Sequence, residues 1–231
     1  MDAVSNSASR PAGDVAPIVR LSQPDMDRVN QLIRERMASD VPLIPALADH
    51  LIAAGGKRLR PMLTIAAARA SGGASGIDAP LHLAAAVEFI HTATLLHDDV
   101  VDTSDLRRGK VAAHLIWGAP SSVLVGDFLF ARASSVISEG EVLQLTRAHD
   151  LNLDQDTYLR IISAKTAELF AAAAEAGAVG ADADEPAVQA LRAYGMNLGL
   201  AFQLADDALD YGGQSEVLGK NAGDDFREGK V

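Results

Sequence analysis

Apolar residues recur at steps of three and four along most of the chain, the spacing that places them on one face of an α-helix. The clearest run is Met26, Val29, Ile33 and Met37, which follows Ser22, a residue type typical of helix N-caps. Proline and glycine divide the remaining apolar runs into separate segments. No alternation typical of a strand extends beyond four residues, so the pattern predicts an all-α fold. The predicted helices are residues 22–37, 42–55, 61–70, 78–101, 112–117, 121–138, 154–175 and 185–211.

Segments without this period are expected to lie outside the helices. Residues 1–20 are rich in Ser, Ala, Pro and Gly, and we expect a flexible N-terminal arm there. Residues 105–110, 177–184 and 212–231 are polar or glycine-rich and predict loops. Residues 21–231 are then expected to form a single helical domain.

Composition narrows the possible functions. The chain has no cysteine, which excludes disulfides and thiolate chemistry. Its net charge of −11 argues against nucleic acid as a main partner, because phosphate backbones are bound by clustered cations. The apolar stretch Leu83–Leu96 is too short for a membrane span and is interrupted by Glu88 and His91. Without a signal-peptide pattern, we expect a cytoplasmic protein.

Two acidic motifs of the form Asp-Asp-x-x-Asp, LLHDDVVD and FQLADDALD, lie inside apolar helices. Residues four apart share a helix face, so each motif presents two carboxylates on one stripe. Buried carboxylates are costly unless a cation neutralises them, and Mg²⁺ binds one or two carboxylates together with substrate phosphates. We predict that the stripes face each other and hold Mg²⁺ on a diphosphate; the alternative is a pair of exposed acidic faces. The predicted ligands are Asp98, Asp99, Asp102, Asp206, Asp207 and Asp210.

Basic residues cluster close to these motifs. The string GGKRLRP carries Lys57, Arg58 and Arg60 beside a predicted helix start, where anions are favoured. Arg107 and Arg108 follow the first acidic motif within one short loop. In so acidic a chain these clusters are interpreted as diphosphate clamps, the alternative being solvated surface charge.

The strings GGKRLRPM, EFIHTATLLHDDVVDTSDLRRGK, SSVLVGDFLFARA, AKTAELF, FQLADDALDY and GKNAGDDFREGK resemble the trans-polyprenyl diphosphate synthases of the isoprenyl diphosphate synthase family. The resemblance covers most of the chain from about residue 45 and is greatest to the long-chain subgroup that makes quinone side chains. It implies a helical bundle with a central cavity. Relative to the family, a helical stretch after Ala133 and the helices that would follow Val231 are expected to be absent.

The resemblance also implies roles for individual residues. Catalytic roles would fall on Asp98, Asp102, Lys165 and Asp206. Isopentenyl diphosphate would be bound by Lys57, Arg60, His91 and Arg108. The allylic prenyl diphosphate would be held by Arg107, Lys165, Thr166, Gln203 and Lys220. His91 has the alternative of a hydrogen-bonded core histidine, and Thr166 and Gln203 that of satisfied helix polars.

The implied reaction is a Mg²⁺-dependent condensation of isopentenyl diphosphate with an allylic diphosphate, giving a long-chain all-trans polyprenyl diphosphate. Ala93 and Thr94, one turn before Asp98, are small, so a tunnel for the growing chain is expected to continue past them. The family also implies a homodimer and a transient membrane contact for product release. The alternatives are a farnesyl or geranylgeranyl diphosphate synthase, a non-catalytic subunit of a heteromeric synthase, a terpene cyclase and a helical interaction protein.

Overall fold

The computed structural model of the chain describes residues 15–53, 56–73, 78–130 and 155–212. Over these residues the fold is all-α, as predicted, with one short hairpin. The helices are α1 (Ala16–Met37), α2 (Leu43–Ala53), α3 (Leu59–Ala70), α4 (Asp78–Val101), α5 (Ala113–Trp117), α6 (Ala119–Phe130), α8 (Gln155–Ile162), the π-helix η1 (Ser163–Ala167), α9 (Glu168–Gly180) and α10 (Glu185–Gly212). The strands β1 (Leu106–Arg107) and β2 (Lys110–Val111) pair antiparallel.

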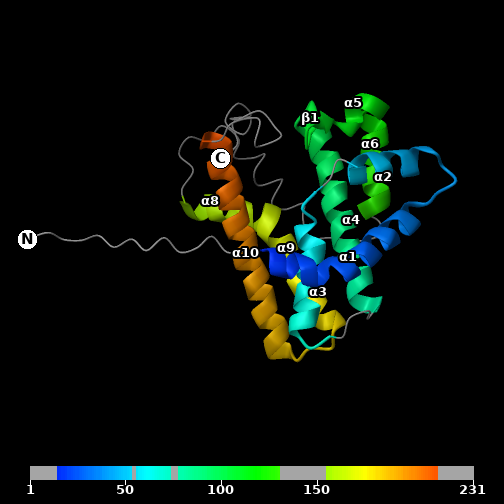
Figure 1. Cartoon of the computed structure of the whole chain (residues 1–231). Helices are drawn as coiled ribbons and strands as arrows, with labels where there is room; N and C mark the ends of the chain where they lie inside the picture. The colour runs from blue at the N-terminus through cyan, green and yellow to red at the C-terminus, as the bar shows by residue number, and fades with distance from the viewer. Residues whose placement is uncertain (1–14, 54–55, 74–77, 131–154, 213–231) are drawn as a thin grey trace, which may run out of the picture.

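Helix α4 lies at the centre of the bundle, where it packs against α1, α3, α5, α6 and α9. α9 lies between α3 and α10, and α10 runs along the flank of the molecule (Figure 1). The last turns of α4 and of α10 lie toward the same end of the bundle in Figure 1. Both acidic motifs belong to these last turns, so the fold brings them to one end of the molecule.

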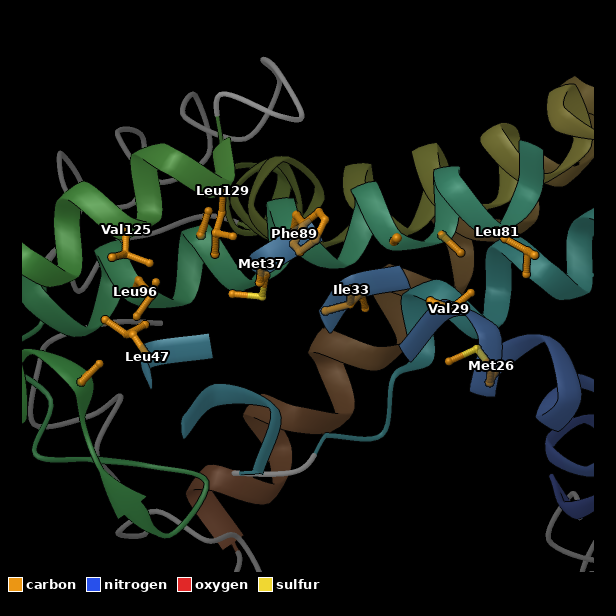
Figure 2. Close-up of a cluster of buried hydrophobic side chains, with 14 of the residues drawn as sticks. Met26, Val29, Ile33, Met37, Leu47, Leu81, Phe89, Leu96, Val125 and Leu129 are labelled. Atoms are coloured by element: carbon orange, nitrogen blue, oxygen red, sulfur yellow. The ribbon is translucent and has the colours of Figure 1, made fainter. Parts of the chain in front are cut away.

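The main hydrophobic core joins α1, α2, α4 and α6 (Figure 2). Met26, Val29, Ile33 and Met37 are all buried in it, which confirms the predicted apolar face of the first helix. Phe89 on α4 packs in the same cluster. The burial of these long apolar side chains stabilises the contact of α1 with the central helix.

A second core between α3, α4 and α9 combines three alanines with the larger side chains of Leu63, Val87, Leu169 and Phe170. Small residues also let α10 approach closely: an added Cβ at Gly199 would lie 2.5 Å from the Cα of Ala167. Arg192 of α10 then donates to Glu175 at 2.7 Å and to Glu168 at 2.9 Å on α9. These contacts fix α10, which carries the second acidic motif, against α9.

Helix α1 begins earlier than the sequence predicted. Residues 16–20 of the expected arm are helical, with Pro17 in the first turn, where its missing N–H costs nothing. Ser22 is not an N-cap, because its buried hydroxyl donates to the carbonyl of Ile18 at 2.8 Å inside the helix. Residues 1–14 of the predicted arm lie outside the described residues.

The loop predicted for residues 105–110 is a tight hairpin. Its two turn residues, Arg108 and Gly109, both have positive φ, of 52° and 75°, as a type I′ turn requires. Residues 177–180 were also predicted as loop but complete α9, so the turn to α10 is confined to 181–184. The predicted helix over 154–175 is present, interrupted by η1. Residues 131–138 and 213–231 lie outside the described part.

Helix α4 is longer than the apolar stretch Leu83–Leu96 that it contains. Among the described residues it is the one helix whose length and composition would allow a membrane crossing. Half of its most apolar window is buried inside the bundle, and core helices pass the same test.

Candidate active site

The site begins at the junction between α3 and α4, where Arg58 forms an ion pair with Glu88. Arg58 has the left-handed backbone conformation, with φ of 47°, immediately before α3. Its side chain is 16% exposed and that of Glu88 is 4% exposed, so both charges are held away from water. Glu88 was not predicted as a site residue; the feature of the sequence that could have indicated it is its place as a lone acid inside an apolar helix, three residues before His91.

Arg60, two residues after Arg58 in the first turn of α3, is a largely enclosed cation. Its guanidinium lies 4.4 Å above the ring centroid of Phe170, in cation–π contact. Burial lowers the pKa of Arg60 to about 10, partly offset by Glu88 and reinforced by Arg108. The side chain therefore stays charged at neutral pH. Its buried Nε has no hydrogen-bond partner among the described residues, an arrangement that an anionic ligand would satisfy.

His91 lies among these arginines. Burial lowers its pKa well below the ordinary value, and the charges of Arg60, Arg108, Arg107 and Arg58 lower it further. The imidazole is therefore neutral at pH 7, so one ring nitrogen donates and the other accepts. The charges of the four arginines thus act together on this ring.

The hairpin supplies two of these arginines. Arg107 donates from Nε to Oδ1 of Asp99 at 2.7 Å, and the pair is completed by a second, short contact from its Nη2. The guanidinium of Arg108 lies against Gly56, so close that it would have to move if a Cβ were added there. Burial lowers the pKa of Arg108, while Glu88 raises it. Lys57 is exposed at the edge of this cluster.

The first acidic motif divides into two roles. Asp98 in the last turn of α4 and Asp102 directly after its end are half-buried and one helical turn apart. Asp99 is fully buried and its carboxylate is bound by Arg107. Asp99 therefore holds Arg107 in place, and its assignment as a metal ligand stays a prediction.

The second motif shows a similar division. Asp206 is half-buried on α10, whereas Asp207 accepts hydrogen bonds from the hydroxyl of Tyr158 at 2.5 Å and from Nε2 of Gln203 at 2.7 Å. Thr166 of η1 donates to Oε1 of Gln203 at 2.7 Å. Both oxygens of Asp207 thus accept hydrogen bonds within the protein, and its assignment as a metal ligand stays a prediction.

Three predicted site residues are described less fully. Lys165 is half-buried within the π-helix η1, a type of helical irregularity that is frequent at functional sites. Asp210 belongs to α10, but its side chain lies outside the description. Lys220 lies outside the described residues altogether.

The half-buried carboxylates of Asp98, Asp102 and Asp206 fit a metal ion that takes its other ligands from a substrate. Over the described side chains, which do not include that of Asp210, no group of three or more His, Cys, Asp or Glu residues could hold a metal by itself, and the predicted six-carboxylate cluster stays a prediction. Mg²⁺ commonly takes one or two carboxylates plus phosphate oxygens and water. Asp98 and Asp102 at the end of α4, and Asp206 on α10, offer this kind of oxygen donor.

Comparison with known proteins finds a matching family model and similar proteins. The family model described as Polyprenyl synthetase matches residues 41–139 and 134–231. The octaprenyl diphosphate synthase of Escherichia coli (strain K12) is 47% identical over 232 residues, covering 92% of this chain and 71% of that protein.

Solved structures are similar as well. The polyprenyl synthase of Caulobacter crescentus CB15, complexed with calcium and isoprenyl diphosphate, is 67% identical with a TM-score of 0.91, over 96% of this chain and 73% of that one. A decaprenyl diphosphate synthase from Rhodobacter capsulatus is 54% identical with a TM-score of 0.87, over 94% of this chain and 73% of that one.

Proposed function

Because this chain belongs to the polyprenyl synthetase family, a family of transferases, we propose that it condenses isopentenyl diphosphate with an allylic diphosphate to form a long-chain all-trans polyprenyl diphosphate. The relatives named octaprenyl and decaprenyl diphosphate synthases, at 47% and 54% identity, support the long product. The single observation in the molecule that carries the proposal is the buried, charged Arg60 with its unpartnered Nε.

This cation would bind the diphosphate of isopentenyl diphosphate. Arg60 stays in place by stacking on Phe170, so its donors are directed before the ligand arrives. Neutral His91 can donate one further hydrogen bond, and Arg108 adds charge. A neutral imidazole avoids a further positive charge among the arginines while still contributing a donor.

The departing allylic diphosphate would be held between the two acidic motifs. Asp98, Asp102 and Asp206 would bind Mg²⁺, which when bound neutralises charge on the leaving group. Arg107 and Lys165 supply cations of the chain itself, and oriented cations stabilise the charge that develops as the carbon–oxygen bond breaks. The surrounding alanine-, leucine- and phenylalanine-rich helices exclude the water that would quench an allylic cation.

Further properties implied by the family resemblance stay predictions. We infer a role in supplying quinone side chains, a homodimer, a cytoplasmic location and a transient membrane contact for product release. The small residues Ala93 and Thr94, one turn before Asp98, support a long product over a farnesyl or geranylgeranyl chain.

The test is Mg²⁺-dependent incorporation of labelled isopentenyl diphosphate into chains whose length is measured by chromatography. D98A and D206A are expected to lower the rate at least about 100-fold, since each removes stabilisation of the leaving group. D78A on the same helix as Asp98 is the matched control, because Asp78 is exposed, and it is expected to retain the parent rate. The proposal fails if the parent incorporates nothing, or if D98A and D206A match D78A.

A further inference from the structure

We propose that Tyr158 is a positioning residue for the second acidic motif, acting through Asp207 to fix the direction in which Asp206 presents its carboxylate. This inference rests on the proposed function. Tyr158 lies on α8, outside both acidic motifs and both basic clusters, and no spacing in the sequence connects it to them.

Asp207 is held at both of its carboxylate oxygens. The hydroxyl of Tyr158 donates to Oδ2 at 2.5 Å, and Nε2 of Gln203 donates to Oδ1 at 2.7 Å. A hydroxyl that donates to a carboxylate over such a short distance forms one of the stronger hydrogen bonds found in proteins. Asp207 therefore has a fixed side-chain orientation before any ligand binds.

The same chain of hydrogen bonds reaches a buried anchor. Gln203 lies one turn before Asp207 on α10, and its Oε1 accepts from the hydroxyl of Thr166 at 2.7 Å. Thr166 is buried within η1. The relay thus ties α10 to η1 through Thr166 and to α8 through Tyr158.

The contact of Tyr158 matters because α8 packs on α10 far less extensively than α9 does. Adjacent residues on a helix point about 100° apart, so fixing Asp207 toward α8 also sets the direction of Asp206. Losing the Tyr158 hydroxyl frees the last turns of α10 to rotate or fray, while the packing of α9 on α10 stays in place. A defect in holding Mg²⁺ and diphosphate is expected, with no defect in the site around Arg60.

The experiment compares Y158F with Y194F. Tyr194 lies on α10 and is 58% exposed, so removing its hydroxyl serves as the matched control. Binding of Mg²⁺ with inorganic pyrophosphate is measured by calorimetry, and thermal unfolding and steady-state kinetics are measured alongside. For Y158F we expect binding about tenfold weaker, a higher Mg²⁺ requirement, and an unchanged KM for isopentenyl diphosphate.

Several outcomes overturn the inference. Binding by Y158F equal to that by Y194F does so, as does a uniform loss in which the melting temperature and both substrate KM values change together, because that indicates a general structural role. Absence of Mg²⁺–pyrophosphate binding by the parent protein also does so. If the parent binds the probe and Y158F weakens it, yet no prenyl transfer is detected, the positioning role stands and the proposed function fails.

A second variant covers the case in which Y158F does not fold. D207N keeps the shape of the side chain but loses the charged acceptor, and the same tenfold loss of pyrophosphate binding is expected. Where both single variants fold, the double variant is expected to be no worse than either one, because the two residues act through one bond. Additive losses, or parent-like binding by D207N, contradict the relay.

Discussion

Removing the carboxylate of Glu88 is expected to destabilise the fold strongly. Glu88→Met keeps a similar volume but leaves Arg58 as a charge without its acid. The two side chains are 4% and 16% exposed, so water screens their interaction little. Loss of one partner of such a buried pair costs about 3–5 kcal/mol, a large part of the roughly 5–15 kcal/mol by which domains are stable. Glu88 also raises the pKa values of Arg60 and Arg108, so its loss further disfavours a cluster of like charges.

The chain provides a matched exposed pair for comparison. Arg28 and Asp78 are 2.9 Å apart, but their side chains are 46% and 76% exposed. Asp78→Met is therefore expected to cost no more than about 1 kcal/mol. The double variant R58M/E88M is expected to be more stable than E88M alone, because the charge of Arg58 is then no longer left inside without its acid.

Urea unfolding followed by far-ultraviolet circular dichroism measures these differences, with the midpoint and slope fitted separately for each variant. The reasoning is refuted if E88M and D78M lose equal stability. It is equally refuted if R58M/E88M is less stable than E88M, since the cost would then come from lost packing and not from an unpaired charge.

Three further predictions concern a proton, the product tunnel and the packing of α10. Because burial lowers the pKa of His91, the unfolded chain binds a proton there at a higher pH than the folded chain does, so the free energy of unfolding should decrease as the pH is lowered from about 7 to about 5. The decrease should be smaller for H91Q, and an equal pH dependence of the two unfolding free energies in urea titrations would contradict this. Thr94 is half-buried one turn before Asp98, and Thr94→Phe should shorten the product seen by chromatography. Ala93→Phe should also shorten the product but lower the stability by about 1–3 kcal/mol more, because Ala93 is fully buried. Unchanged product lengths would contradict the predicted position of the tunnel. Gly199→Ala should lower stability by about 1–3 kcal/mol in thermal unfolding, since its Cβ would meet Ala167, and an unchanged melting temperature would argue against this close approach.

The helices were largely predictable because each depends on local information. The apolar face from Met26 to Met37 follows from a period of three to four residues, and glycine and proline mark the ends of most segments. The start of α1 was missed because a serine hydroxyl caps a helix or bonds back within it, and Ser22 does the second. The hairpin was missed because two-residue strands are too short to show any alternation.

The candidate site was predictable only in its residue types. The two acidic motifs share one spacing, so the sequence could not tell which aspartate of each would be bound internally. That depends on partners outside each motif: Asp207 binds Tyr158, 49 residues away, and Asp99 binds Arg107 on the hairpin, 8 residues away. Such pairings are set by how helices pack, and a single sequence carries no periodic signal of them.

The π-helix η1 between α8 and α9 determines how the two helices would respond to the loss of one residue there. A π-turn contains one residue more than the α-helical turn that it replaces. Deleting one residue within Ser163–Ala167 would allow an uninterrupted α-helix, and α8 would keep nearly the same phase relative to α9, because the π-turn already absorbs the extra residue. Tyr158 would still face α10, so the damage from such a deletion would fall on the π-turn itself, where Lys165 and Thr166 would change the faces that they present.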